Sequence, residues 1–283
     1  MIHDHRRCEL GEGLLWHPIR EQLFWFDITG KAMLSQDRTG QRLWRFPEMV
    51  SAAGWVSQDT LLIASERGIF LFDIESEAVE SLCLLEADRP QNRSNDGRAD
   101  PQGGFWIGTM SKTNAAGAGA IYRYYKGEIR CLYNGITIPN AICFTPDGRT
   151  AQFTDTAHGR VMRVSLNTEG WPSGEPAVFL DLAAQGRAPD GAVIDVDGVL
   201  WLAEWGSARV AAYAPDASFL RAIPFDAPHT SCPAFGGPDL GTLFCTSALK
   251  GMDAAARAAQ PDSGKTFAAP GVARGQIEHR VLL

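Results

Sequence analysis

Four side chains that carry oxygen ligands stand at matching places in a unit that the chain repeats. They are Glu12, Asn95, Asn140 and Asp190. Each precedes a short apolar segment, a turn rich in Gly or Asp, and a second apolar segment. Carboxylate and amide oxygens are hard ligands that suit Ca²⁺, Mg²⁺ or Mn²⁺ better than an ion that prefers thiolates. The spacing therefore predicts a divalent-cation site, provided that the repeats bring the four residues together.

Each of these residues also has a simpler interpretation when it is read alone. Asn95 stands in an Asn-Asp-Gly sequence and Asp190 in a Pro-Asp-Gly sequence, and both are typical of turns. A polar residue at the start of a strand can also bond backbone groups that closure of the fold leaves unpaired. The shared register in four repeats is what favours one common site over four separate turns.

The repeat predicts the fold class. Its second apolar segment recurs six times, as LFWFDI, LLIAS, FWIGT, QFTDT, LWLAE and LFCTS. A period of roughly forty to fifty residues, with turns of Pro, Asp and Gly between short strands, is typical of a four-stranded propeller blade. We therefore expect an all-β protein in which residues 1–283 form a single domain. This domain is a six-bladed β-propeller with four-stranded antiparallel blades and a metal site in the central channel. The Ala-rich stretch 253–260 is expected to form a helical turn at most.

The register also predicts where the candidate residues lie in the propeller. All four fall at or just before the first strand of a blade, which is the innermost strand and lines the channel. Residues 49–51 and 231–233 hold the same place in the second and sixth repeats and offer no carboxylate. The loops 109–120 and 247–265 are expected on the same face, where long loops commonly form the rim or lid of a pocket.

Three further residues have predicted roles around this site. Arg93 lies two residues before Asn95, so an extended segment points both to one side. Since a cation repels a guanidinium, a polar substrate explains Arg93 better than a metal does. Asp27 and Asp155 end second strands, and we interpret them as acceptors of backbone N–H bonds that stabilise their blades.

The histidines and cysteines offer no clear metal ligands. His17 and His229 lie near channel-facing segments, and we interpret them as structural; His17 is placed at the end of a hairpin away from the channel mouth. None of the six cysteines forms a C-x-x-C pair, and several stand in apolar runs. They are interpreted as reduced thiols packed as small hydrophobic side chains. Cys232 is the cysteine nearest the channel, and no chemistry is assigned to it.

Composition narrows the classes of partner. The net charge is −7 and the pI is about 5.4, which disfavours nucleic acid because its binding needs a basic surface. There is no basic stripe for anionic lipid, no apolar run of membrane-spanning length, and no apolar signal segment in MIHDHRRCEL. We therefore expect a cytoplasmic protein, a monomer or a weak homo-oligomer, that binds neither membrane nor nucleic acid.

Five segments together resemble the successive signatures of one family. They are LGEGLLWHP with FWFDI, RSNDGRADPQGGFWIGTM, IPNAICFTPDGRTAQFTDT, PDGAVIDVDGVLWLAEWG and CPAFGGPDLGTLFCTSA. The family is the senescence marker protein (regucalcin) / gluconolactonase family of sugar lactonases, and the resemblance covers residues 10 to about 250. It implies a six-bladed propeller with one divalent metal in the channel. The metal ligands would be Glu12, Asn140 and Asp190, with Asn95 touching metal or substrate and Arg93 binding substrate.

The resemblance implies a divalent-metal-dependent hydrolase that opens a sugar (aldono-) lactone to the aldonic acid. The metal would act as a Lewis acid, and Asp190 would be both ligand and general base. Ca²⁺ is favoured, with Zn²⁺, Mn²⁺ and Mg²⁺ as alternatives. The sugar stays open because the loop SKTNAAGAGA lacks the Glu that binds sugar hydroxyls in some relatives. Two other functions stay open: a metal-dependent phosphotriesterase or esterase, and a non-catalytic calcium-binding propeller.

Overall fold

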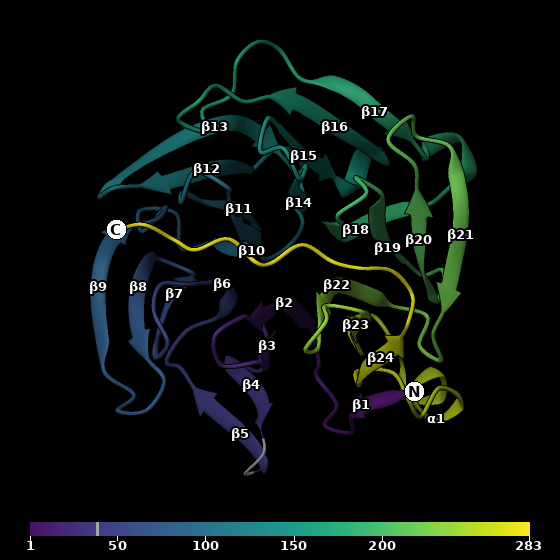
Figure 1. Cartoon of the computed structure of the whole chain (residues 1–283). Helices are drawn as coiled ribbons and strands as arrows, with labels where there is room; N and C mark the ends of the chain where they lie inside the picture. Colours follow the sequence, from purple (N-terminus) through teal and green to yellow (C-terminus); the bar gives the residue numbers. More distant parts are fainter. Residues whose placement is uncertain (38–39) are drawn as a thin grey trace.

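The computed structural model describes residues 1–37 and 40–283, and in this part the chain forms six four-stranded antiparallel sheets around a central axis (Figure 1). The sheets are β2 to β5, β6 to β9, β10 to β13, β14 to β17, β18 to β21, and β22 to β24 with β1. The first strand of each blade packs against the first strands of its neighbours and lines the axis. The predicted six-bladed β-propeller is confirmed.

The strands are short and follow the predicted repeat. The innermost strands are β2 (Gly11–His17), β6 (Val50–Trp55), β10 (Asn92–Ala99), β14 (Pro139–Phe144), β18 (Ala188–Ile194) and β22 (Thr230–Gly236). The second strands are β3 (Gln22–Asp27), β7 (Thr60–Ser65), β11 (Phe105–Ser111), β15 (Thr150–Asp155), β19 (Leu200–Trp205) and β23 (Thr242–Ser247). The third strands are β4 (Ala32–Asp37), β8 (Gly68–Asp73), β12 (Gly119–Tyr125), β16 (Arg160–Ser165), β20 (Arg209–Tyr213) and β24 (Thr266–Pro270).

The outermost strands differ in origin between the sixth blade and the rest. In the first five blades they are β5 (Gly40–Arg45), β9 (Val79–Leu84), β13 (Glu128–Ile136), β17 (Ala177–Asp181) and β21 (Phe219–Pro224). In the sixth blade the outermost strand is β1 (Ile2–Asp4), which pairs antiparallel with β24 and comes from the opposite end of the chain. This pairing joins the first and last segments, so the ring is closed by backbone hydrogen bonds.

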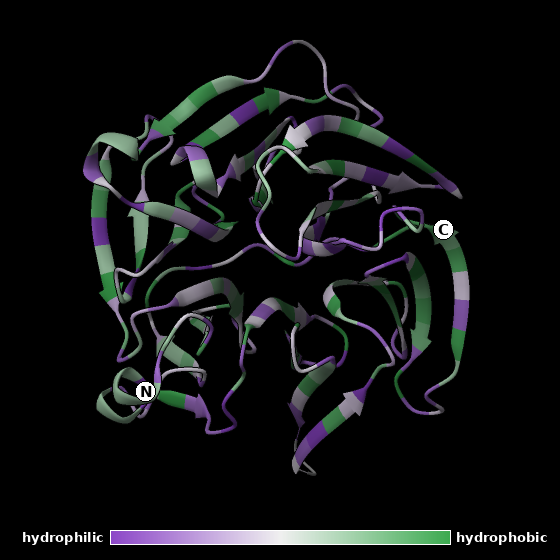
Figure 2. Cartoon of the chain, turned by 180° about the vertical axis from the view of Figure 1, so that it is seen from behind, coloured by the Kyte–Doolittle hydropathy of each residue, from purple (hydrophilic) through white to green (hydrophobic). Residues whose placement is uncertain are grey.

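The hydrophobic core lies in the wedges between adjacent blades. One cluster joins Phe24 and Trp44 of the first blade to Ile63 and Phe72 of the second, and five similar clusters are found around the described part of the ring. The outer strands are half-exposed, and Figure 2 shows hydrophilic and hydrophobic residues alternating along them. Period-two alternation with one face buried is what fixes strand register.

Each innermost strand carries a break in register at the same place. The pairing with the second strand shifts between Glu12 and Leu15, Val50 and Ala52, Ser94 and Gly97, Asn140 and Cys143, Pro189 and Ala192, and Thr230 and Pro233. A β-bulge of this kind bends the strand and redirects a side chain. The backbone has a positive φ directly after two of the candidate residues, at Gly13 (61°) and Ala141 (54°). The bulges therefore turn equivalent side chains toward the axis.

The remaining elements lie outside the sheets. The helix α1 (Ala254–Ala259) is short, as the sequence predicted for residues 253–260, and its N-terminus is capped by the Asp253 carboxylate. The C-terminal segment 271–283 crosses the middle of the propeller on the face seen in Figure 1. Its backbone bonds to Trp55 and Gly103, and the Gln276 amide donates to Phe144 O and Ile194 O. The tail therefore covers the end of the channel where the innermost strands finish. No helix in residues 1–37 and 40–283 is long and apolar enough to cross a membrane.

Candidate metal and substrate site

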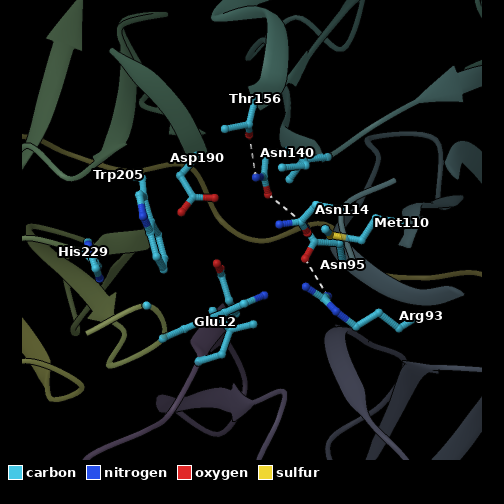
Figure 3. A pocket seen from close by; sticks show the side chains of 14 residues that line it. Glu12, Arg93, Asn95, Met110, Asn114, Asn140, Thr156, Asp190, Trp205 and His229 are labelled. Carbon is cyan, nitrogen blue, oxygen red and sulfur yellow. Dashed lines mark hydrogen bonds between the residues drawn. The ribbon is translucent and has the colours of Figure 1, made fainter. Parts of the chain in front are cut away.

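A cavity of about 400 Å³ opens at the other end of the channel, where the innermost strands begin. All five residues predicted for the site line it: Glu12, Arg93, Asn95, Asn140 and Asp190 (Figure 3). The other lining residues are Leu10, Met110, Asn114, Ile138, Thr156, Trp205, His229, Lys250 and Gly251. The structure thus brings together residues that are up to 178 positions apart, counting from Glu12 to Asp190.

A chain of hydrogen bonds fixes the polar side of the cavity. Arg93 Nη1 donates to Asn95 Oδ1 at 2.7 Å, and Asn95 Nδ2 donates to Asn140 Oδ1 at 3.0 Å. Asn140 Nδ2 in turn donates to Thr156 Oγ1 at 2.8 Å, and Thr156 Oγ1 donates to Pro189 O at 2.7 Å. Blades three, four and five are thereby linked through the side chains of the site. The predicted pairing of Arg93 with Asn95 on one side of β10 is confirmed.

The two carboxylates of the cavity are buried without a cationic partner. Glu12 is 7% exposed and Asp190 is 4% exposed, and neither forms an ion pair in the part of the chain that the structure describes. They reach into the cavity from different blades, with their oxygens directed toward its centre (Figure 3). Burial, and then the charge of Asp96, raise the pKa of Glu12 to about 8. Burial, and then the charge of Glu12, raise the pKa of Asp190 well above its ordinary value.

This arrangement fits a divalent cation. Buried carboxylates that repel each other are stabilised when a cation takes the place of protons between them. Among the described residues no group of three or more His, Cys, Asp or Glu side chains converges, so the remaining ligands would have to be neutral oxygens. The amides of Asn140 and Asn95 are the neutral groups present, and such a donor set suits hard cations better than a thiolate-preferring ion.

Asp96 lies outside the cavity lining and connects two of the blades that carry the site. It follows Asn95 in β10 but does not line the cavity, and its carboxylate accepts a hydrogen bond of 2.8 Å from Ile142 N in β14. Burial raises the pKa of Asp96 to about 6. This bond ties blade three to blade four directly beneath Asn95 and Asn140.

The blade-stabilising interpretation of Asp27 and Asp155 is confirmed. The Asp27 carboxylate accepts from Glu9 N and Leu10 N at 3.0 Å each, and from Gly30 N at 3.1 Å. Asp155 accepts in the same way from the backbone amides of Thr137, Ile138 and Ala157, at 2.8, 3.0 and 3.2 Å. Each aspartate therefore fastens the segment that leads into its innermost strand, and so positions the candidate ligand two or three residues further on.

The loops that were expected at the channel mouth do border the cavity. The loop between β11 and β12 spans 112–118 and contributes Asn114, while the loop between β23 and β24 spans 248–265 and contributes Lys250 and Gly251. The first loop is shorter than predicted because β11 continues to Ser111. Lys250 was missed by sequence reasoning, since a single lysine in a long loop carries no signal of its direction.

An aromatic wall was also missed. Trp205, the last residue of β19, stacks on His229 with ring centroids 4.4 Å apart and planes 8° apart. Burial lowers the pKa of His229. His229 thus lines the cavity and supports the Trp205 ring, beyond the merely structural role predicted for it. His17 is buried far from the cavity and its Nε2 bonds to Ser57 O at 2.9 Å, so the prediction for His17 is confirmed.

The cysteines are free thiols in the described chain. Cys8, Cys143, Cys232 and Cys245 are buried, as expected for small hydrophobic side chains, but Cys131 is exposed on the outer strand β13 and does not fit that interpretation. Cys232 does not line the cavity. Burial raises the pKa of Cys232 well above its ordinary value, so its thiol is protonated.

Comparison with known proteins assigns the chain to a family. Residues 10–249 match the model of the SMP-30/Gluconolactonase/LRE-like region. A putative sugar lactone lactonase of Rhizobium meliloti (strain 1021) is 41% identical over 273 residues, which are 95% of this chain and 92% of that protein. The 6-deoxy-6-sulfogluconolactonase of Pseudomonas putida is 30% identical and covers 92% of this chain, with 90% of its own length.

Among solved structures, a calcium-binding protein, regucalcin, from Agrobacterium tumefaciens is 37% identical. It superposes with a TM-score of 0.97, covering 100% of this chain and 97% of that one. The match spans all six blades and every residue of the candidate site. The chain therefore belongs to the SMP-30/gluconolactonase/LRE-like family.

Proposed function

We propose that this protein hydrolyses a sugar lactone to the aldonic acid with the help of one divalent cation. The observation that carries the proposal is that one cavity holds two buried carboxylates next to a buried arginine, and that none of the three forms an ion pair within residues 1–37 and 40–283. The names of the relatives at 41% and 30% identity, both lactonases of sugar lactones, support the same reaction class.

In this proposal Glu12, Asn140 and Asp190 hold the cation, and Asn95 is shared between cation and substrate. A divalent cation bound there would supply Lewis-acid polarisation of the lactone carbonyl and electrostatic stabilisation of the oxyanion. Ca²⁺ is the favoured ion because the donors are two carboxylates and neutral amides, with Mg²⁺, Mn²⁺ and Zn²⁺ as alternatives. The name of the regucalcin relative, a calcium-binding protein, agrees with this choice.

Asp190 acts as the general base. Its carboxylate accepts a proton from the attacking water while the water oxygen bonds to the carbonyl carbon. The ring C–O bond then breaks, the proton is delivered to the departing ring oxygen, and a carboxylic acid and a free hydroxyl result; the acid then releases its own proton to solvent and becomes the carboxylate. Arg93 and Asn95, which are already joined by a 2.7 Å hydrogen bond, orient the substrate oxygens. The face of Trp205 provides an apolar wall for the carbon side of the sugar.

The test is a hydrolysis assay on protein that has been stripped with a chelator and reloaded with Ca²⁺, Mg²⁺, Mn²⁺ or Zn²⁺. A panel of aldonolactones, read by pH-stat, is run beside a phosphotriester and an aryl ester. We expect lactone turnover that depends on the added metal. Preferred turnover of the phosphotriester or ester would establish the alternative hydrolase, and tight metal binding without any turnover would establish a non-catalytic calcium-binding propeller.

Substitutions separate the roles of the residues. Asp190→Ala should lower kcat by at least about 10²-fold, in the range expected for loss of a general base. Arg93→Ala and Asn95→Ala should raise KM or lower kcat while the protein still binds metal in a calorimetric titration. Asp216→Ala is a control, because Asp216 is exposed on a turn outside the cavity and its carboxylate accepts hydrogen bonds from Ser218 N and Oγ. Near-normal turnover by Asp190→Ala would defeat the assignment of the base.

A further inference from the structure

We propose that Lys250 and Arg93 form a subsite for an anionic group on the substrate. The preferred lactone would then carry a carboxylate, sulfonate or phosphate substituent outside its ring. This inference rests on the proposed lactonase function and specifies the substrate class of the same site. Four observations carry it: the fixed position of Lys250, the absence of an ion pair at either cation among the described residues, the charge of the cavity, and the lack of acidic lining residues other than Glu12 and Asp190.

Lys250 is held in place by its own backbone and by a charged clamp. Lys250 N donates to Glu9 O at 2.8 Å, and Leu249 N donates to the same oxygen at 3.1 Å. Arg257, from the helix α1, pairs with the Glu9 carboxylate at 2.6 and 2.9 Å. The same guanidinium donates to Met252 O at 3.0 Å and to Leu249 O at 3.3 Å. The loop therefore presents Lys250 to the cavity from a defined position.

Both cations of the cavity lack an acidic partner. In residues 1–37 and 40–283 the Lys250 ammonium donates no hydrogen bond and forms no ion pair. Arg93 is only 4% exposed, and its guanidinium bonds to Ser94 O and Asn95 Oδ1 but to no carboxylate. Other rim and loop lysines are paired: Lys112 with Glu66 and Lys265 with Asp262, each at 2.6 Å. Buried cations are almost always paired, and the buried Arg93 and the half-buried Lys250 have only the more distant charges of Glu12 and Asp190 to balance them, so a cation bound to those carboxylates would leave both free for an anion.

The charge of the cavity points to an anion. Among its lining residues, Glu12 and Asp190 are balanced by Arg93 and Lys250, and His229 is neutral near pH 7 because burial lowers its pKa. A divalent cation on the two carboxylates leaves the lining side chains with two positive charges in excess, while the carboxylate of Asp96 stands behind the cavity lining. A neutral lactone gives a product with one carboxylate, which matches one of them. A lactone with an anionic substituent gives a product with two negative charges, which matches both.

The rest of the rim does not compete for these cations. The loop 112–118 offers Asn114 to the cavity and contains no acidic residue. Glu66, whose charge reaches Arg93, is engaged by Lys112 Nζ and by Met49 N. Besides the amides of Asn95, Asn114 and Asn140, which can both donate and accept, the lining supplies the positive charges of Arg93 and Lys250. These charges suit an oxyanion.

The experiment compares glucono-1,5-lactone with counterparts that carry a phosphate, a sulfonate or a carboxylate at carbon 6. Each is assayed with the metal-loaded wild type, Lys250→Met, Lys250→Arg and the control Lys265→Met, whose lysine lies in the same loop but outside the cavity. We expect the wild type to prefer at least one anionic lactone about tenfold in kcat/KM, as a charge-assisted hydrogen bond allows. Lys250→Met should abolish this preference, mainly through KM, while Lys250→Arg and Lys265→Met keep it.

A second measurement needs no turnover. Calorimetry on the metal-loaded protein should show that 6-phosphogluconate binds more tightly than gluconate in the wild type, and equally weakly in Lys250→Met. Equal handling of neutral and anionic ligands by the wild type, or a preference that Lys250→Met retains, overturns the anionic subsite. Hydrolysis of neutral lactones without preference leaves the lactonase proposal intact. Absence of all lactone hydrolysis instead defeats the proposed function, and calorimetry then decides the subsite by itself.

Discussion

The metal-free protein should become more stable at alkaline pH when Glu12 is replaced by Gln. Burial holds the pKa of Glu12 at about 8, above its ordinary value of 4.5. A carboxyl group whose pKa is raised by folding contributes most to stability below its ordinary pKa, and that contribution is lost as the pH rises through the folded value. Above pH 8, chelated wild-type protein therefore contains a buried negative charge beside Asp190, and Glu12→Gln removes it without changing the shape of the side chain.

The size of the effect follows from the shift. Each unit of pKa corresponds to about 1.4 kcal/mol, so a shift from 4.5 to about 8 sets an upper limit of roughly 5 kcal/mol. Glu12 and Asp190 take up protons as an interacting pair, because the charge of Glu12 raises the pKa of Asp190. We therefore expect about 2 kcal/mol from the single substitution at pH 8.5, and almost nothing at pH 5, where Glu12 is protonated.

The assay is urea unfolding of wild type and Glu12→Gln from pH 5 to 9, once with a chelator and once with saturating Ca²⁺. With the chelator the variant should be the more stable protein at pH 8.5. With Ca²⁺ the order should reverse, since bound ligand stabilises only the protein that binds it. Equal stabilisation of both proteins by Ca²⁺ would refute Glu12 as a ligand. A variant that is less stable at every pH with the chelator would refute the account of the buried charge.

Three further predictions concern positions around the site. Arg98→Met should destabilise the protein by about 3–5 kcal/mol in urea unfolding, because it leaves Glu278 buried and unpaired, and Arg98→Met/Glu278→Leu should recover most of this loss. Asp155→Ala should cost about 1–3 kcal/mol by leaving backbone amides unsatisfied, with Asp147→Ala on an exposed turn as the control; an unchanged unfolding midpoint would count against the clamp. Trp205→Ala should raise the KM for lactones about tenfold, which corresponds to a loss of about 1.4 kcal/mol of binding free energy from the apolar contact, while calorimetry shows unchanged metal affinity. An unaltered KM would remove Trp205 from the substrate site.

The convergence of the site could be predicted because it is a property of the repeat. Glu12, Asn95, Asn140 and Asp190 each stand the same number of residues, within two, before the end of a second strand. Radial repeats bring equivalent positions to one axis, so register along the chain becomes proximity in space. Register alone did not reveal that a β-bulge recurs in every innermost strand and turns these side chains toward the axis.

The features that escaped prediction depend on segments that the repeat does not contain. β1 is three residues long and carries no sign that it pairs with β24. The tail 271–283 has no strand pattern, and it is fixed by side-chain contacts such as the pair of Arg98 with Glu278. Lys250 and His229 reach the cavity through loop geometry, which is set by tertiary contacts such as Arg257 with Glu9 rather than by local sequence. The positions of these non-repeating segments therefore become known only from the three-dimensional structure.

These same segments explain how the propeller can hold a site of repelling charges. Glu12 and Asp190 lie on innermost strands of different blades, and a slight separation of the blades would relieve their repulsion. The β1–β24 pairing closes the ring against such a separation, and the tail bonds to four blades at the opposite end of the channel through Trp55, Gly103, Phe144 and Ile194. Unfavourable local arrangements persist at functional sites when the surrounding structure over-determines them. The closure of the ring therefore keeps the two carboxylates in one cavity, where the cation of the proposed function, rather than a movement of the blades, would neutralise them.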